Sequence, residues 1–409
     1  MTVRAVKKTE AETFPWVGLV VISLSVFASV TTEFLPTGLL PDMARELEVS
    51  QSQIGLLVTI FAGTVVLTAA PLAALTRRFS RKYLVIVVLL IVALGSILTA
   101  IAPTYEVIIG ARIIGGLAHG LFWAVVGAYA AHLVPPHQLG RALAITSAGA
   151  TAAFVLGVPL GTAIGHLVGW RLAFVVIGVL LVVLSILVLK FLPAVDHRVP
   201  VKTGEIPLPM HRDRTIPAVA IVCIAVILVM GAHNTFYTFI APYLIEVTGF
   251  EEDAVPVILF LFGGGGAIGL VLAGIVTDRL PRSGMILAFA LVAASITVLA
   301  VFSTNHVVVI AAIVVWGVAF GSGPVMLQAR MLRAASVRVR DLASAFFTTS
   351  FNVAIGGGAL IGAILLDSLG LTVLPAVSVG IMVVGVVFLI GTDAWLRRRD
   401  TAYLRARGA

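Results

Sequence analysis

The sequence predicts an all-α polytopic membrane protein, with twelve transmembrane helices in two pseudo-symmetric six-helix bundles. Of the 409 residues, 60% are hydrophobic and 11% are charged. Soluble domains carry about 25% charged residues, so this chain has too little polar surface to cover a water-soluble globule. A helix that spans a bilayer needs about 20 apolar residues. The stretches that meet this requirement are 16–40, 52–76, 83–102, 107–131, 142–165, 172–191, 215–240, 254–277, 284–305, 307–329, 342–366 and 371–394.

The placement of the positive charges supports this topology. The net charge is +8, which by itself is also compatible with nucleic-acid binding. With the N-terminus placed in the cytoplasm, however, 24 of the 27 Lys and Arg residues fall on cytoplasmic segments. Arg45 and Arg171 fall outside, and Arg112 lies within a span. This is the positive-inside pattern, so we expect both termini in the cytoplasm and no nucleic-acid partner.

The two halves of the chain are related by an internal repeat. The longest polar segment, 193–214, separates an expected N-terminal half at 1–192 from a C-terminal half at 215–409. A constant offset of 201 residues aligns Gly, Pro and Arg positions through four helix pairs, which shared apolar residues alone would not establish. The aligned pairs are Pro41 and Pro242, Arg78 and Arg279, Arg81 and Arg282, Gly116 and Gly317, Gly120 and Gly321, Gly157 and Gly358, and Gly161 and Gly362. We therefore predict a duplicated six-helix unit.

A charged loop follows the eighth span, with the pattern Gly274, Asp278, Arg279 and Arg282. An Asp at a helix end can pair with an Arg on a neighbouring helix and hold the cytoplasmic side closed. The matching loop of the first half has Arg78 and Arg81 but carries Arg77 where the Asp is expected. These residues are our gating candidates, with Asp278 as the central one, and a purely topological role for the charges is the alternative.

The fifth span contains Gly157, Pro159 and Gly161. Small residues allow membrane helices to approach closely, and a proline inside a span can kink it. We expect these three residues to serve helix packing and the movement of the fifth span.

Ionisable residues inside spans are functional candidates because charge is costly in the membrane. Glu33 is the one acid placed well inside a span, where a low dielectric favours the neutral carboxyl group. Arg112 and His119 are seven residues apart on one helix face, and Trp123 follows one turn later. We predict that Glu33 binds the proton, while the alternatives are helix packing for Glu33, snorkelling for Arg112 and a hydrogen-bonded core position for His119.

A substrate cavity is expected between the halves, near the midplane. The repeat mate of Glu33 is Asn234, which follows His233. Aromatic and amide side chains on the seventh and eleventh spans lie at similar depth, although helix packing also explains them. The cavity candidates are Phe34, His119, Trp123, His233, Asn234, Tyr237, Phe347, Phe351 and Asn352, with Phe346 beside them.

With these motifs the chain resembles the major facilitator superfamily over essentially its whole length. The loop at Gly274 to Arg282 resembles the signature loop of that superfamily, and the Gly157–Gly161 segment resembles the motif of its drug/proton antiporters. The segment around Glu33 and Pro41 is most similar to bacterial arabinose-type sugar, purine and chloramphenicol efflux permeases. The resemblance implies alternating access, proton-coupled export of small neutral or weakly polar molecules, and a role for Arg112 in proton coupling. It also implies a bacterial inner-membrane location, a monomer and no cofactor.

Two other functions remain as alternatives. A proton-coupled uptake symporter would use the same fold, and a membrane sensor would show no substrate flux. We do not predict an enzyme, because the sequence has no nucleophile elbow and no metal cluster. The glycine run at 263–266 lacks the GK[ST] of a phosphate-binding loop, so we interpret it as close helix packing.

Overall fold

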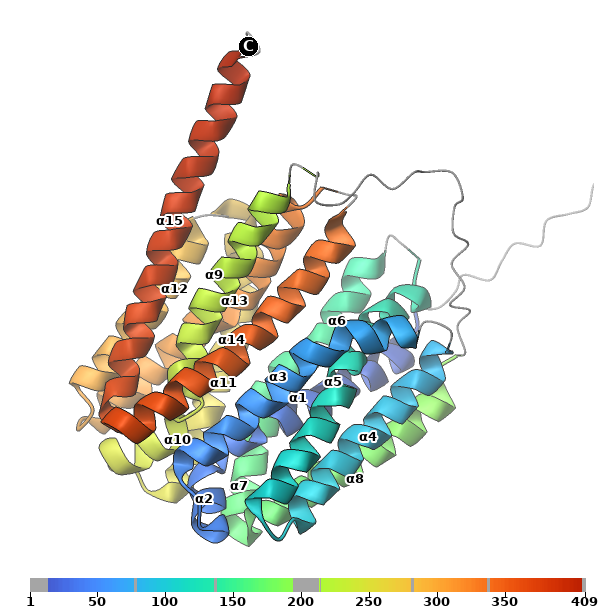
Figure 1. The fold of residues 1–409 in the computed structure, drawn as a ribbon, viewed down its shortest axis with the longest axis vertical. Helices are drawn as coiled ribbons and strands as arrows, with labels where there is room; N and C mark the ends of the chain where they lie inside the picture. The colour runs from blue at the N-terminus through green and yellow to red at the C-terminus, as the bar shows by residue number, and fades with distance from the viewer. Residues whose placement is uncertain are drawn as a thin grey trace, which may run out of the picture.

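The computed structural model describes residues 14–76, 79–135, 138–193, 213, 215–280, 283–336 and 339–406. Within these residues the regular secondary structure is helical throughout, and twelve helices are long and apolar enough to cross a membrane. The predicted fold class is therefore confirmed. Figure 1 shows the helices running roughly side by side, with α1–α8 forming one group and α9–α15 the other.

The helix bounds agree with the predicted spans to within a few residues at most ends. In the first group the long helices are α1 (Trp16–Gly38), α3 (Gln51–Leu75), α4 (Arg81–Ile101), α5 (Tyr105–Leu133), α6 (Leu139–Ala152) with α7 (Val158–Val168), and α8 (Trp170–Phe191). In the second group they are α9 (Ile216–Tyr237), α11 (Val255–Arg279), α12 (Ser283–Val301), α13 (His306–Ala334), α14 (Arg340–Leu369) and α15 (Leu374–Ala406).

Short helices complete the chain, and the sequence analysis did not predict them. They are α2 (Leu40–Leu47), η2 (Ala153–Gly157), α10 (Ile240–Pro242), η4 (Tyr243–Val247), η5 (Glu252–Ala254) and η7 (Leu371–Val373). The spans predicted to reach residues 40 and 240 end earlier, at Gly38 and Tyr237, because a new helix begins just beyond each. Pro41 lies in the first turn of α2, where its missing N–H leaves no hydrogen bond unmade.

The repeat is visible in the packing of the helices. A Cβ added to Gly116 on α5 would lie 2.8 Å from the carbonyl oxygen of Phe61 on α3. A Cβ added to Gly317 on α13 would lie 2.2 Å from the carbonyl oxygen of Phe262 on α11. Both residues of the second contact stand 201 positions after those of the first. The two halves therefore use the same backbone contact, which only glycine permits.

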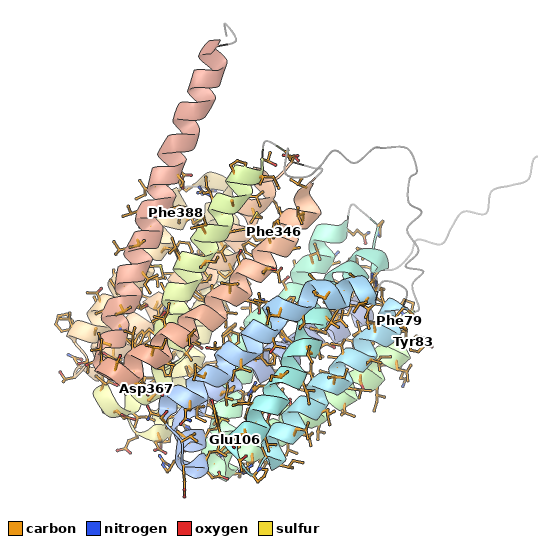
Figure 2. The ribbon with its side chains drawn as sticks, viewed as in Figure 1. Phe79, Tyr83, Glu106, Phe346, Asp367 and Phe388 are labelled. Atoms are coloured by element: carbon orange, nitrogen blue, oxygen red, sulfur yellow. The ribbon has the colours of Figure 1, made fainter. Side chains whose placement is uncertain are left out.

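Charge is divided between the two ends of the molecule. We call the end that carries α2 and α10 the α2 end, and the opposite end, where α4 begins and α8 finishes, the linker end. Figure 2 shows Glu106 and Asp367 at the α2 end, with Phe79 and Tyr83 toward the linker end. Acidic residues at the α2 end include Asp42, Glu46, Glu48, Glu106, Glu246, Glu251, Glu252 and Asp367, and basic residues at the linker end include Arg81, Lys82, Lys190, Arg279 and Arg330.

We expect Gly317→Ala to destabilise the protein, because its Cβ would meet a backbone carbonyl oxygen that no side-chain rotation can remove. Overpacking of this kind costs about 1–3 kcal/mol, so the midpoint of thermal unfolding in detergent should fall. Gly110→Ala is the matched control, because no atom lies within 4 Å of the added methyl group. Alanine is the better helix former, so that variant should unfold at or above the wild-type temperature. Equal midpoints for the two variants would contradict this account of the α11–α13 contact.

Candidate functional site

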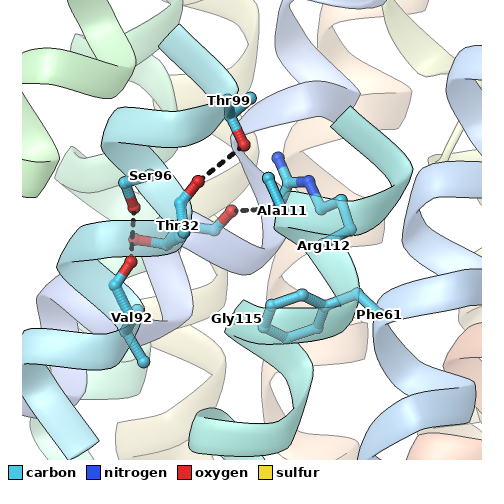
Figure 3. A pocket seen from close by; sticks show the side chains of 9 residues that line it. Thr32, Phe61, Val92, Ser96, Thr99, Ala111, Arg112 and Gly115 are labelled. Carbon is cyan, nitrogen blue, oxygen red and sulfur yellow. Dashed lines mark hydrogen bonds between the residues drawn. The ribbon is translucent and has the colours of Figure 1, made fainter. Parts of the chain in front are cut away.

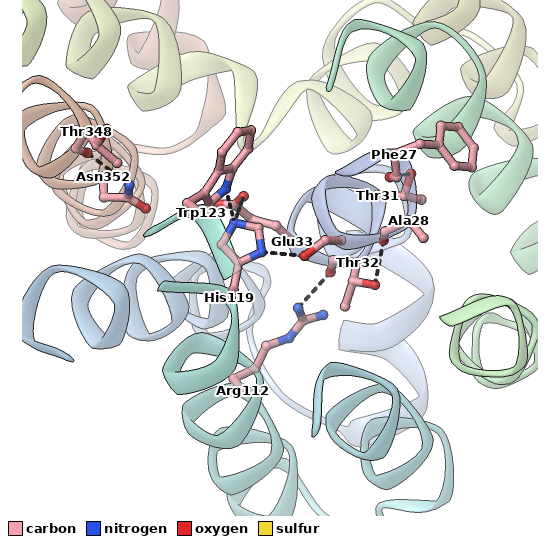
Figure 4. A network of polar contacts seen from close by, with 11 residues as sticks. Phe27, Ala28, Thr31, Thr32, Glu33, Arg112, His119, Trp123, Thr348 and Asn352 are labelled. Atoms are coloured by element: carbon pink, nitrogen blue, oxygen red, sulfur yellow. Dashed lines mark hydrogen bonds and ion pairs between the residues drawn. The ribbon is translucent and has the colours of Figure 1, made fainter. Parts of the chain in front are cut away.

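Glu33 and His119 meet in the interior of the first helix group. Glu33 lies on α1, 4% exposed, and its Oε2 is 3.2 Å from Nε2 of His119 on α5. The other carboxylate oxygen, Oε1, has no hydrogen-bond partner among the described residues. Figure 4 shows the two side chains pointing toward one another across the gap between their helices. The sequence named both residues but gave no reason to pair them.

Both nitrogens of the His119 ring have neighbours. Oγ of Ser29, one turn before Glu33 on α1, is 2.8 Å from Nδ1. The indole Nε1 of Trp123, one turn after His119 on α5, donates to Nε2 over 2.8 Å. Ser29 and Glu33 are four residues apart on α1, and His119 and Trp123 are four residues apart on α5. Each pair therefore shares one face of its helix, and the two faces meet. His119 is a hydrogen-bonded core histidine, as one interpretation of the sequence held, and it is also the centre of a four-residue network.

Arg112 is buried rather than snorkelled to the interface, since it is 3% exposed. Its Nη1 donates to the backbone oxygen of Thr32 over 2.9 Å, while Nε and Nη2 have no protein partner among the described residues. The guanidinium lies 5.8 Å from the ring centre of Phe61 and 5.2 Å from that of Phe174, a cation–π arrangement. A cavity of about 10 Å³ beside it has room for about one water molecule (Figure 3).

The second helix group has an aromatic cluster at the equivalent place. His233 on α9 stacks on Phe320, with ring centres 3.5 Å apart, and on Tyr237 at 4.8 Å. Phe320 stands in the repeat position of His119. Asn234, the repeat mate of Glu33, donates to the oxygen of Met230 on its own helix. The two halves therefore share their backbone packing but differ in chemistry.

Phe154 packs against both helix groups, and it was not among the residues predicted from the sequence. The ring lies 4.8 Å from that of Phe34 on α1 and 6.4 Å from that of Tyr237 on α9. It belongs to η2, a π-helical turn directly before the Pro159 segment, and a Cβ on Gly263 would lie 2.3 Å from its carbonyl oxygen. The glycine run on α11 therefore packs against the other helix group. The only hint of Phe154 in the sequence is that an aromatic residue stands one turn before Gly157.

The cavity candidates on α14 lie apart from the Glu33 cluster. Phe347 and Phe351 contact each other, with ring centres 6.2 Å apart. Asn352 is buried and donates to the oxygen of Thr348. In Figure 4, Asn352 lies on the side of Trp123 that is away from Glu33.

The glycine–proline segment brings α7 close to α1. A Cβ on Gly157 would lie 2.0 Å from Oγ1 of Thr31, and one on Gly161 would lie 2.4 Å from Cδ1 of Leu35. Pro159 lies in the first turn of α7, so the helix continues beyond η2. The close helix contact expected of these glycines is present.

The predicted gate at the linker end is only partly described. Arg81 is the first residue of α4, and Arg279 is the last residue of α11. Arg78 and Arg282 lie outside the described residues, as does the side chain of Asp278. The gating role of these residues stays a prediction.

Polar contacts join the two helix groups at the α2 end. They involve acids of the second group and polar residues of α2 and α3. The contacts are Arg45 with Glu252 (2.6 Å), Gln51 with Glu246 (2.5 Å), and Ser52 with Asp367. The hydrogen bond to Glu252 raises the pKa of the Arg45 guanidinium above its ordinary value. Deeper in the interface, Oγ1 of Thr59 donates to the oxygen of Gly356 over 2.9 Å.

The sequence matches the family model of the Major Facilitator Superfamily over residues 22–260 and 222–408. The chain belongs to this superfamily. A probable sugar efflux transporter of Helicobacter pylori is 33% identical over 366 residues, which cover 90% of this chain and 92% of that protein. A probable sugar efflux transporter of Mannheimia succiniciproducens is 30% identical and covers 91% of this chain and 92% of its own length.

Solved structures of superfamily members share the fold. A bacterial homologue of the human lysosomal transporter Spinster, inward-facing and unoccupied, matches 94% of this chain and 96% of its own with a TM-score of 0.71 and 16% identity. The nucleoside transporter NupG matches 92% of this chain and 99% of its own, with a TM-score of 0.74 and 13% identity. The family match and the twelve apolar helices of the described residues together identify a multi-pass membrane transporter.

A double-mutant cycle with Arg45→Ala and Glu252→Ala should give a coupling energy of about 0.2–1 kcal/mol, typical of exposed ion pairs. The two side chains are 65% and 44% exposed, so solvent screens their attraction. The measurement is thermal unfolding in detergent at low and high salt, and the coupling should shrink as salt rises. A coupling energy above about 2 kcal/mol, or one that does not change with salt, would contradict the interpretation of the Arg45–Glu252 pair as a weak contact that opens readily.

Proposed function

We propose that the chain is a proton-coupled transporter that exports small neutral sugars, or neutral molecules of similar size and polarity, by alternating access. The observation that carries the proposal is the buried contact between Glu33 and His119. The relatives named as sugar efflux transporters support the choice of cargo and of direction.

Oε2 of Glu33 lies 3.2 Å from Nε2 of His119, the nitrogen that also accepts the indole N–H of Trp123. A carboxylate next to this electron-rich nitrogen is repelled by it, whereas a protonated carboxyl group is neutral. Both residues are nearly excluded from solvent, so water cannot screen that repulsion. A carboxyl group in this position changes its interactions sharply when it gains or loses a proton, and that is the property a proton-coupling group needs.

Arg112 is placed to favour the ionised form of Glu33. Its guanidinium is anchored to the carbonyl of Thr32, the residue before Glu33, and attracts the carboxylate electrostatically. We propose that Glu33 carries the proton and that Arg112 promotes its release.

The character of the candidate cavity favours uncharged cargo. His233, Tyr237, Phe351 and Asn352 offer ring faces and an amide, with no acid among them. The C–H faces of a sugar can pack on aromatic rings while its hydroxyl groups exchange hydrogen bonds with polar side chains. A dication would lack the acidic partners that it needs in a membrane interior.

The contacts at the α2 end fit one side of a transport cycle. With both termini cytoplasmic, as the charge pattern predicts, the α2 end faces the outside. Its polar contacts then close the outer side. We propose that this is an inward-facing state of a bacterial inner-membrane protein, a monomer with halves 1–192 and 215–409 joined by a linker at 193–214.

The decisive measurement is flux in inside-out vesicles with an acidic interior. We expect a neutral pentose to accumulate, to be lost on addition of an uncoupler, and to be lost in Glu33→Gln, whose side chain cannot ionise. Chloramphenicol and a purine nucleoside serve as comparison cargoes. Glu106→Gln is the matched control because Glu106 is an exposed acid at the end of α5.

Each other outcome changes a different part of the proposal. Uncoupler-sensitive flux that survives in Glu33→Gln would move the proton site elsewhere. Cargo that leaves the vesicles together with protons would show an uptake symporter. Movement of chloramphenicol or the nucleoside, and not of the pentose, would replace the cargo class.

A further inference from the structure

The cavity beside Arg112 is an enclosed space with polar groups on two sides. Nε and Nη2 of the buried guanidinium have no hydrogen-bond partner among the described residues. On α4 the cavity is lined by Ser96 and Thr99, which are also buried. Figure 3 shows these side chains around the same space, whose volume is about 10 Å³. The cavity therefore lies where charged donors need an acceptor.

The hydroxyl groups of α4 have already donated their hydrogens. Oγ of Ser96 donates to the carbonyl oxygen of Val92 over 3.0 Å, and Oγ1 of Thr99 donates to that of Gly95 over 2.8 Å. Each hydroxyl oxygen keeps lone pairs that can accept a hydrogen bond. Arg112 does not reach them, since its Nε and Nη2 bond to no protein group among the described residues. Donors and acceptors are thus separated by the cavity.

One water molecule satisfies both sets of groups. In a planar guanidinium the N–H of Nε and one N–H of Nη2 point the same way, so a single oxygen can accept both. The two hydrogens of that water are then available to Ser96 and Thr99. A buried water needs about two to four polar partners and a volume of about 10–15 Å³, and the cavity supplies both. A chloride ion is larger and would face hydroxyl oxygens whose hydrogens are already used.

The second helix group has no arginine at the equivalent place, and large apolar residues stand where the cavity has glycines. The repeat mate of the arginine is Ile313. Gly95, which lines the cavity, corresponds to Ile296. Gly115, which also lines it, corresponds to Trp316. All three apolar side chains are buried. The small residues that leave room for a ligand therefore occur in the half that carries the charge.

We propose that one ordered water molecule occupies this cavity, bridges Arg112 to Ser96 and Thr99, and holds the guanidinium apart from the carboxyl group of Glu33. Ser96 and Thr99 are then positioning residues, which act on Glu33 through Arg112. The effect on Glu33 rests on the proposed function and deepens it, whereas the water site itself does not depend on that function.

The water link limits how strongly Arg112 acts on Glu33. The guanidinium attracts the carboxylate electrostatically, yet its Nε and Nη2 do not bond to it, and Oε1 of Glu33 has no partner among the described residues. A guanidinium released from α4 is free to bond to that oxygen, and a direct charge pair holds a carboxyl group in its ionised form. With the link in place, Arg112 favours the carboxylate from a distance, and Glu33 can still take up a proton.

The other charged residues and histidines on the helices around this site lie toward the ends of the bundle. His119 of α5 faces Glu33, while Phe61 of α3 and Phe174 of α8 present rings to the guanidinium. Helix α3 has no charged residue, and α2 and α11 carry theirs at the α2 end and the linker end. Those on α4 to α8 with described side chains are Arg81, Lys82, Glu106, Arg141, His166, Arg171 and Lys190. Arg112 and His119 are therefore the described ionisable groups that act on Glu33 from nearby.

The first test is a structure of the wild-type transporter in lipid, at a resolution that shows ordered water. We expect one water molecule within hydrogen-bond distance of Arg112, Ser96 and Thr99. When bromide replaces chloride in the buffer, no bromide should appear at the site. An empty cavity, or an ion in it, would overturn the inference whatever the flux measurements show.

The second test is the dependence of arabinose uptake into inside-out vesicles on the interior pH, with arabinose as a neutral pentose. Thr99→Val keeps the shape of the side chain and removes the hydroxyl, so the link to α4 weakens and Arg112 can pair with Glu33. A carboxyl group paired with a guanidinium needs more acid to take up a proton. The midpoint of uptake should therefore move to lower pH, by about a three- to tenfold higher proton concentration, the effect of one hydrogen bond.

Two further variants separate the hydroxyl from packing. Thr99→Ser keeps a hydroxyl and should have the wild-type midpoint. Thr235→Val is the matched control, because Thr235 is buried on α9 and makes the same bond to the carbonyl oxygen four residues earlier. It should also keep the wild-type midpoint. If Thr99→Val does not fold, Ser96→Ala removes the other acceptor and should shift the midpoint in the same direction.

The outcomes separate this inference from the proposed function. Equal midpoints for wild type, Thr99→Val and Ser96→Ala would overturn the positioning role of the α4 hydroxyls. If uptake by wild type does not depend on pH, the proposed proton coupling fails instead, and the first test still decides the water site.

Discussion

The low dielectric of the membrane interior is the constraint on which this structure depends. Charge that cannot be hydrated must be held by neighbouring groups, and in the first helix group Glu33, Arg112 and His119 are held in this way. Arg112 uses a backbone oxygen and two aromatic rings, and Glu33 uses His119. These contacts require helices to lie close together, which glycines such as Gly116 and Gly157 permit.

Duplication has preserved the backbone contacts while the side chains have diverged. Gly116 against Phe61 and Gly317 against Phe262 are the same contact in the two halves. Yet His119 is replaced by Phe320, and Glu33 by Asn234. A contact that depends on the absence of a Cβ constrains the glycine and leaves nearby side chains free to change. One half can therefore carry ionisable groups while the other carries aromatic rings at the equivalent place.

The contacts that join the two helix groups at the α2 end are individually weak. Its contacts are several exposed or half-buried polar pairs, each of which solvent weakens. Together with the backbone contact between Phe154 and Gly263, they hold the two groups in register. A single strong buried ion pair in this place would oppose the opening that the proposed alternating access requires.

The sequence by itself determined the membrane class, the spans and the repeat, and it marked Glu33 and Arg112 as ionisable residues inside spans. It could do so because hydropathy and the cost of charge act through the bilayer, whatever the neighbouring helix. It did not determine the partner of Glu33, the burial of Arg112, the bridging place of Phe154, or the helices α2 and α10. Those features depend on how each helix is rotated and how closely it approaches the next. Ser29 and Trp123 are ordinary residues in their own helices, and only the packing of α1 against α5 places both on the ring of His119.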